Sequence, residues 1–182
     1  MYVAYQKKKD NICEYFLYMF QIEDIIRACR FDRQMIESVL LPKYPSEPAV
    51  QSDVRQWYFG LTDQMIDEHI QEKGHLVSLS NKIDEVFDFH LYLTNNIKEV
   101  AYQMQFAKVG PILGELRQKQ DAQSLNDLNL ALNAVYGFTI LRLKGAQVSN
   151  STVNAVSALM SWLNALSAKF KAYESGELKL DL

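Results

Sequence analysis

Hydrophobic residues recur at intervals of three and four positions along most of the chain, which is the spacing of amphipathic α-helices. The alternation of hydrophobic and polar residues that marks a half-buried β-strand is nearly absent. One helical stripe, inside a predicted helix over residues 9–30, consists of Ile12, Tyr15, Phe16, Met19, Ile22 and Ile26. The pattern predicts an all-α fold, an irregular bundle of six or seven helices.

Prolines, glycines and capping residues divide this pattern into separate helices. Asp32 is placed to cap the second helix, and the segment PKYPSEP (42–48), with three prolines in seven residues, is the clearest loop. Gly74 is a natural left-handed end for the third helix. The predicted helices cover residues 9–30, 33–41, 49–73, 81–95, 97–119, 124–144 and 150–175.

Three of these boundaries depend on local signals. Asn81 and Asp84 have the spacing of a capping pair, and they mark the start of the fourth predicted helix. Gly110-Pro111 should kink the fifth helix or split it in two, because proline removes a hydrogen bond from the helix interior. Ser124 and Asp127 have the spacing of a capping box at the start of the sixth helix.

The size of the chain fits one globular domain. It has 182 residues, of which 48% are hydrophobic and 23% are charged, and it contains only 7 glycines and 4 prolines. These values argue against a long disordered linker. We therefore expect a single helical domain over residues 1–182, with residues 1–8 and 177–182 as frayed ends.

Charge argues against nucleic-acid and membrane partners. The formal net charge is −3, and the one basic run, Lys7 to Lys9, is followed at once by Asp10. No apolar run is long enough to span a bilayer, and the apolar block after the lysines is too polar for a signal peptide. The acidic pair Glu23-Asp24 also disfavours a helix lying on a membrane surface. We expect a cytoplasmic protein that binds neither nucleic acid nor membrane.

The residues that could hold a metal or cofactor do not form a recognised site. Glu72 and His75 have the Glu-x-x-His spacing of di-iron bundles, but Gly74 lies between them and no second pair exists. Cys13 and Cys29 would lie about 24 Å apart on one helix, so we expect reduced thiols. The chain has no glycine-rich phosphate loop, dinucleotide fingerprint or serine elbow. The sequence predicts no metal and no cofactor.

The most informative charged residues lie in the stretch EYFLYMFQIEDIIRA, residues 14–28. On a wheel of about 100° per residue, Glu23 falls inside the apolar arc, Arg27 just outside it, and Asp24 to one side. We therefore expect Asp24 to be solvated and Glu23 to be buried. A buried carboxylate needs a partner or a proton, and Arg27, one turn further on, is a candidate partner in a structural network.

The same construction places other polar residues on or near apolar helix faces. His90 lies in the middle of the stripe of the fourth helix, Arg142 at the edge of that of the sixth, and Arg117 near the end of the fifth. One interpretation is a buried structural network in which these polar groups form hydrogen bonds with one another and fix helix register. The alternative is a ligand or active site, with Glu23 or His90 as acid or base and the arginines holding an anion.

Five runs of sequence carry a resemblance to a known family. These runs are NICEYFLYMFQIEDIIRA, EKGHL, FHLYL, PILGELR and LNAVYGFTILRLKG, in this order along nearly the whole chain. The chain resembles an uncharacterised domain-of-unknown-function family of Bacteroidetes bacteria. The resemblance implies a small, cytoplasmic, all-helical protein without an assigned activity. The runs contain the polar residues selected above together with one further histidine, giving Glu23, Arg27, His75, His90, Arg117 and Arg142 as the candidate site.

The function best supported by these patterns is non-enzymatic self-association or partner binding. The predicted helix over residues 150–175 has an apolar stripe on one side and small residues on the other, which would let a second helix approach closely. We expect a homodimer with this helix as its candidate interface. The alternative interpretation of the small residues is a weakly polar exposed face, because alanine is a good helix former in general. The rival hypothesis is a small-molecule binding protein or enzyme that uses Glu23, His90 and the arginines.

Overall fold

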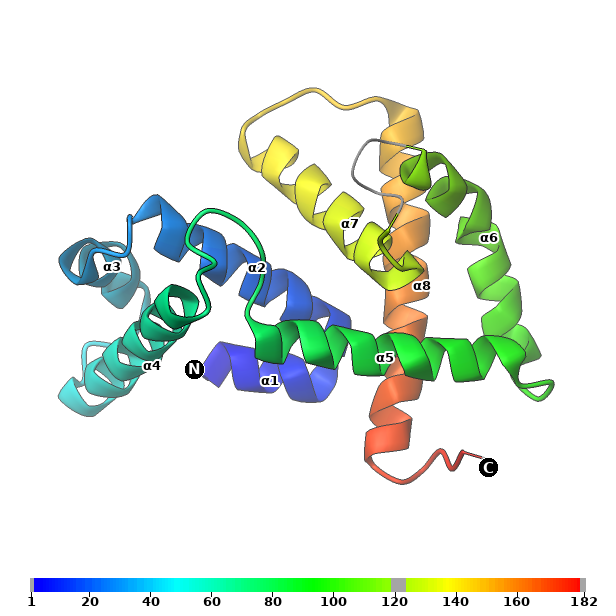
Figure 1. Ribbon diagram of the computed structural model, residues 1–182, viewed down its shortest axis with the longest axis horizontal. Helices are drawn as coiled ribbons and strands as arrows, with labels where there is room; N and C mark the ends of the chain where they lie inside the picture. The colour runs from blue at the N-terminus through cyan, green and yellow to red at the C-terminus, as the bar shows by residue number, and fades with distance from the viewer. Residues whose placement is uncertain (1, 119–123, 181–182) are drawn as a thin grey trace.

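Eight α-helices build the chain in the computed structural model, which describes residues 2–118 and 124–180 (Figure 1). No β-strand occurs among these residues, so the all-α prediction is confirmed, although six or seven helices were expected and eight are present. A short 3₁₀ turn, Leu41–Lys43, follows the third helix. The α-helices are α1 (Tyr2–Asp10), α2 (Ile12–Ala28), α3 (Arg33–Leu40), α4 (Pro48–Asp67), α5 (Val77–Asn95), α6 (Val100–Arg117), α7 (Asp127–Leu143) and α8 (Asn150–Glu174).

The additional helix arises at Asn11, inside the segment predicted as one helix over residues 9–30. Asn11 has an extended backbone (φ −153°, ψ 103°), and its side-chain oxygen accepts a hydrogen bond of 3.0 Å from the backbone N–H of Glu14. An asparagine that caps a new helix in this way interrupts the preceding one. Residues 2–8, which were expected to belong to a frayed end, lie in α1.

The connection between α4 and α5 differs most from the prediction. Helix α4 ends at Asp67, six residues earlier than expected, and His69 just beyond it has a left-handed backbone with φ 56°. Helix α5 begins at Val77, so Asn81 lies inside it and is not a cap. The carboxylate of Glu68 accepts a hydrogen bond of 2.7 Å from the N–H of Val77. The carboxylate of Glu68, from outside the helix, thus takes the place of the predicted capping pair Asn81 and Asp84.

Two more predicted boundaries need correction, and two are confirmed. Helix α6 is not split at Gly110-Pro111, because it continues through Pro111 as one helix, and the kink that was the other expectation stays a prediction. Asn126, not Ser124, caps α7 by accepting a hydrogen bond from the N–H of Asn129. Asp32 caps α3 as predicted. The last predicted helix, over residues 150–175, ends within one residue of α8, and Gly176 just beyond it has a left-handed backbone with φ 79°.

Helix α8 is the central element of the core, with α2, α6 and α7 packed against it (Figure 1). Its apolar stripe is fully buried by these neighbours at Trp162 and Leu166. Helices α3 and α4 lie at the opposite end of the molecule from α6, beyond α2. Helix α2 therefore contributes to the core on one side and faces the α4–α5 connection on another. No helix among the described residues is long and apolar enough to cross a membrane.

Candidate functional site

Glu23 is the buried acid of the candidate site, with 1% of its surface exposed, as the helical wheel predicts. One carboxylate oxygen accepts a hydrogen bond of 3.0 Å from the backbone N–H of Leu76. The other lies 2.5 Å from Nδ1 of His75, whose ring stacks on Phe20 at a centroid distance of 3.8 Å. Both oxygens are therefore engaged, and the imidazole is the exposed member of the pair, at 31%.

Arg27, the arginine expected to pair with Glu23, binds elsewhere. Its guanidinium donates to the Asp24 carboxylate at 2.9 Å and to the backbone carbonyl oxygens of Ile70 and Gly74 at 3.2 and 2.5 Å. Asp24 is half exposed, as predicted, and its other oxygen accepts a hydrogen bond from the Tyr136 hydroxyl at 2.7 Å. The expected Glu23–Arg27 pair is thus wrong, because the α4–α5 connection supplies partners to both side chains.

These contacts hold the α4–α5 connection, residues 68–76, against α2. Glu23 satisfies a backbone N–H of the connection, and Arg27 satisfies two of its carbonyl groups. A buried backbone group without a partner is costly, so a connection of this length needs such contacts. We call Glu23, Arg27 and His75 the loop clamp. Among the described residues, no hydroxyl or thiol forms a hydrogen bond with His75 that could make it part of a nucleophilic pair.

The structural role of Glu23 can be tested with two variants. Glu23→Ala leaves the Leu76 N–H and the His75 ring without their partner, so we expect the free energy of unfolding to fall by about 2 kcal/mol. Glu23→Gln keeps an oxygen acceptor and should lose about 1 kcal/mol or less. Urea unfolding measures both. If Glu23→Ala is as stable as the wild type, the clamp does not hold the connection.

His90 belongs to a second, separate network in the core. Trp162 can only donate, and its Nε1–H donates to the Tyr102 hydroxyl oxygen at 3.0 Å. The Tyr102 hydroxyl lies 2.6 Å from Nδ1 of His90, and we assign the hydroxyl proton to this contact, which places the proton of His90 on Nε2. Burial lowers the pKa of His90 to about 4, although the nearby Asp127 carboxylate opposes this shift. His90 is therefore neutral and acts as a hydrogen-bond acceptor in the core.

The two remaining arginines of the candidate site lie outside both networks. Arg117 donates to the Leu125 carbonyl at 2.6 Å and to the Asp127 carboxylate at 2.5 Å, which fixes the approach to α7. Arg142 is exposed, with its guanidinium 5.7 Å from the centre of the Phe138 ring. Among the described residues, no hydrogen bond or ion pair joins either arginine to Glu23 or His90.

The cysteines and possible metal ligands are likewise separate from these networks. Cys13 and Cys29 are free thiols, as expected, and both are buried; burial raises the pKa of Cys13 to about 12, which keeps its thiol unreactive. Within residues 2–118 and 124–180, no group of three or more His, Cys, Asp and Glu side chains is arranged to hold a metal ion.

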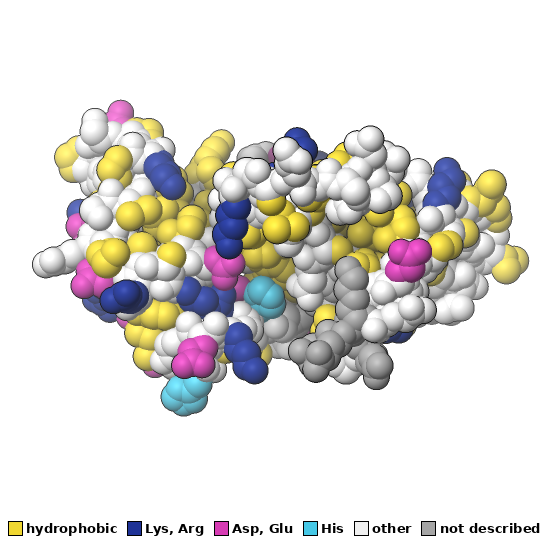
Figure 2. All heavy atoms as spheres, turned by 90° about the horizontal axis from the view of Figure 1, so that it is seen from above, with side chains coloured by type: hydrophobic (Ala, Val, Ile, Leu, Met, Phe, Trp, Pro, Cys, Tyr) yellow, Lys and Arg dark blue, Asp and Glu magenta, His cyan; other side chains and the backbone are white. Residues whose placement is uncertain are grey.

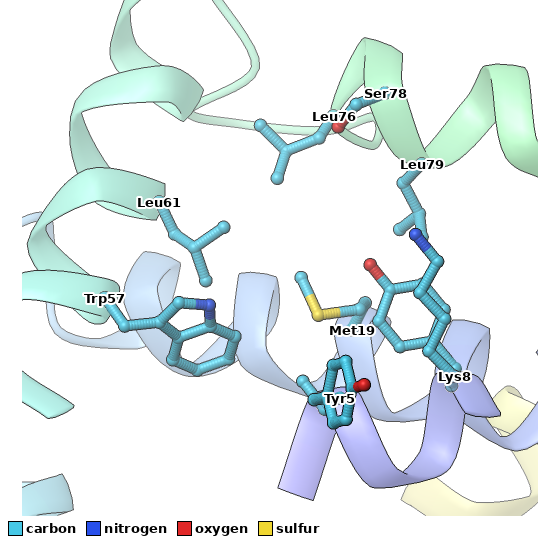
Figure 3. Close-up of a pocket in the computed structure, with 10 residues that line it drawn as sticks. Tyr5, Lys8, Met19, Trp57, Leu61, Leu76, Ser78 and Leu79 are labelled. Carbon is cyan, nitrogen blue, oxygen red and sulfur yellow. The ribbon is translucent and has the colours of Figure 1, made fainter. Parts of the chain in front are cut away.

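A pocket that sequence reasoning missed lies between α1, α2, α4 and the start of α5 (Figure 3). Its volume is about 230 Å³. The floor is apolar and buried, and it includes Met19, Leu76 and Leu79. The walls are aromatic and half-buried or exposed, and they consist of Tyr5, Tyr15 and Trp57. We call this the aromatic pocket.

Leu76 connects the aromatic pocket to the loop clamp. Its backbone N–H is bonded to Glu23, whereas its side chain forms part of the pocket floor (Figure 3). The sequence signal for the pocket was weak, because tyrosines within helical segments are more often core-edge residues than a binding surface. Three aromatic residues from three helices reveal a pocket only once the helices are packed.

The fold and these sites define an all-helical protein with a clamped interhelical connection, a buried His–Tyr–Trp network and an open aromatic pocket. The family model described as Domain of unknown function (DUF4924) matches residues 1–177. The chain belongs to this family, which confirms the resemblance to an uncharacterised domain family. Neither a curated protein nor a solved structure matches the chain.

Proposed function

We propose that the protein is a non-enzymatic, cytoplasmic binding protein and that a partner protein inserts an aromatic side chain into the aromatic pocket. The observation that carries this proposal is the convergence of Tyr5, Tyr15 and Trp57 from three helices around a buried apolar floor. Tyrosine and tryptophan are the side chains that most often dominate the binding energy of protein interfaces. Tyr5 is 67% exposed, so this wall of the pocket is accessible to a partner.

The size of the pocket favours a side chain over a whole small molecule. Sites for drug-sized molecules usually measure about 300–1,000 Å³. The aromatic pocket has about 230 Å³, and it is open on one side. A single anchoring side chain, continuous with a partner surface outside the pocket, suits these dimensions.

The charge at the rim indicates an acidic partner. Lys8 lines the pocket with its ammonium group 5.7 Å from the centre of the Tyr15 ring. Lys9 beside it is exposed, whereas Lys7 is neutralised by Glu14 at 2.7 Å. Carboxylates on either side of the anchoring residue would lie near these positive charges, and complementary charge accelerates and orients association.

The candidate polar residues support a structural role better than catalysis. Both oxygens of Glu23 are engaged, and Arg27 donates to three acceptors. His90 is neutral within a buried network. The alternative, a small-molecule binding protein or enzyme using these groups, would need them to face a shared cavity. A cytoplasmic location and an origin in Bacteroidetes, expected from the sequence, belong to the proposal.

The experiment uses an amidated pentapeptide with one tryptophan flanked by two acidic residues on each side. Fluorescence anisotropy of the labelled peptide measures the dissociation constant for the wild type and for Lys8→Glu, Trp57→Leu and Lys9→Glu. We expect Trp57→Leu to weaken binding about 30-fold, the effect of losing a central anchor contact. Lys8→Glu should weaken it several-fold and more than Lys9→Glu, which changes the net charge equally but lies outside the pocket lining.

The same peptide with alanine in place of tryptophan should not bind measurably. Equal affinity of the two peptides, or of wild type and a folded Trp57→Leu variant, would contradict the proposal. Circular dichroism confirms that each variant is folded before its affinity is compared.

The homodimer through residues 150–175 stays a prediction with less support. Helix α8 buries its apolar stripe inside the chain, at Trp162 and Leu166 among others. Its outer side presents small and polar residues such as Ser161 and Ala168.

A further inference from the structure

A second cavity, distinct from the aromatic pocket, lies where α6, α7 and α8 meet near the end of α7 and the start of α8. Its volume is about 380 Å³. Val156 and Leu159 form a buried floor, and Ile112, Leu116 and Phe138 form half-buried walls. Figure 2 looks onto this end of the molecule and shows hydrophobic side chains exposed among polar ones. We call this cavity the three-helix crevice.

Small residues on α7 and α8 create the space. Ala134, Gly137 and Ala155 all line the crevice, and a Cβ atom added at Gly137 would meet nothing within 4 Å. A larger side chain at Gly137 would therefore meet no neighbour at its Cβ atom. The crevice is thus a gap between packed helices that this sequence leaves unfilled.

The polar groups at the rim define what the crevice can bind. Asn133, Ser151 and Thr152 supply neutral hydrogen-bonding groups, and Glu115 is the charged residue of the lining. Arg142 lies outside the lining, with its guanidinium against the Phe138 ring. An apolar floor below a carboxylate and hydroxyl groups suits a molecule with an apolar body and a positively charged end.

We propose that the three-helix crevice binds a small apolar amine, with the apolar body on Val156 and Leu159 and the ammonium group at Glu115. The volume lies within the range of small-molecule sites and is too small to admit a helix of a partner protein, whose diameter is about 10–12 Å. This site is independent of the aromatic pocket and of the partner proposed for it.

The experiment compares three probes that share one apolar chain: octylammonium, octanol and octanoate. Isothermal titration calorimetry measures their affinities below their critical micelle concentrations. We expect octylammonium to bind most tightly and octanoate least tightly. Glu115→Gln should weaken octylammonium about 2- to 5-fold, the effect of one exposed ion pair, and leave octanol unchanged.

Two glycine variants test whether the probes enter the crevice. Gly137→Phe fills the volume from an exposed helix position and should abolish binding of octylammonium and octanol. Gly60→Phe on α4 is the matched control, because a Cβ atom at Gly60 also meets nothing within 4 Å and Gly60 does not line the crevice. This control should bind both probes as the wild type does.

Three results would overturn the proposal. The first is that neither octylammonium nor octanol binds, and the second is that Gly137→Phe binds as well as Gly60→Phe. The third is a wild-type dimer, detected by sedimentation, that Gly137→Phe converts to a monomer, since a second copy of the chain would then occupy the crevice. Equal binding of octylammonium and octanoate would refute the assignment of an amine.

Discussion

Replacing Tyr102 by phenylalanine is expected to lower the free energy of unfolding by about 3 kcal/mol, because one hydroxyl serves two buried partners. The Tyr102 oxygen accepts from Trp162 Nε1 at 3.0 Å, and its proton is donated to His90 Nδ1, 2.6 Å away. The substitution removes little volume but leaves an indole N–H and an imidazole nitrogen unpaired in the core. Each such group costs about 1–3 kcal/mol.

Urea unfolding at pH 7.5 measures this loss, with Tyr173→Phe as the matched control. Tyr173 is 37% exposed, so removing its hydroxyl should change stability by less than about 0.5 kcal/mol. The expected difference between the two variants therefore reports on the buried network, and not on the loss of a phenol in general. Equal stability of the two variants would mean that the network contributes nothing.

Helical periodicity predicts the burial of two of the polar residues in this chain, Glu23 and His90, but not that of Thr62, Glu99 and Ser167. Glu23 and His90 are each 1% exposed, and Asp24, next to Glu23, is half exposed. The wheel succeeds because the direction of a side chain on a helix depends only on the local backbone. Because α2 buries the stripe that contains Phe16 and Ile26, Glu23 on the same arc is buried with it.

The partners of those residues could not be predicted from the same pattern. His75 lies 52 residues after Glu23, in a connection whose path depends on left-handed backbones at His69 and Gly74. The periodicity of helices carries no information on how such a connection returns across α2. Arg27 was the nearest positive charge in sequence, but the carbonyl groups of Ile70 and Gly74 compete for it.

The predicted start of α5 was wrong for the same reason. The backbone N–H groups of Leu76 and Val77, at the start of α5, donate to the carboxylates of Glu23 and Glu68, neither of which is local to the predicted start at Asn81. Capping signals in a sequence describe only hydrogen bonds between neighbouring residues. A carboxylate that tertiary structure brings to the helix end can replace such a local cap, and the sequence signal then gives the wrong start. The aromatic pocket could likewise not be predicted from the sequence, because its walls come from three helices.

The second large effect is a loss of stability in acid that depends on His90. Burial lowers its pKa to about 4, whereas the pKa of a histidine in an unfolded chain is about 6.5. Between these two values the unfolded chain binds a proton that the folded protein does not. Stability therefore falls as the pH drops from about 6.5 to about 4, and His90 accounts for about 3 kcal/mol of that fall.

His90→Gln separates this contribution from that of the carboxylates, which also titrate in acid. Glutamine does not ionise, and its amide oxygen can still accept the hydrogen bond of the Tyr102 hydroxyl. Urea unfolding at pH 7.5 and pH 4.5 should show a loss that is about 2–3 kcal/mol smaller in His90→Gln than in the wild type. His69→Asn, at an exposed histidine in a left-handed turn that asparagine tolerates, should keep the full acid dependence. If all three proteins lose the same stability between these pH values, protonation of His90 does not cause the loss, and the burial of His90 does not determine the acid sensitivity of the fold.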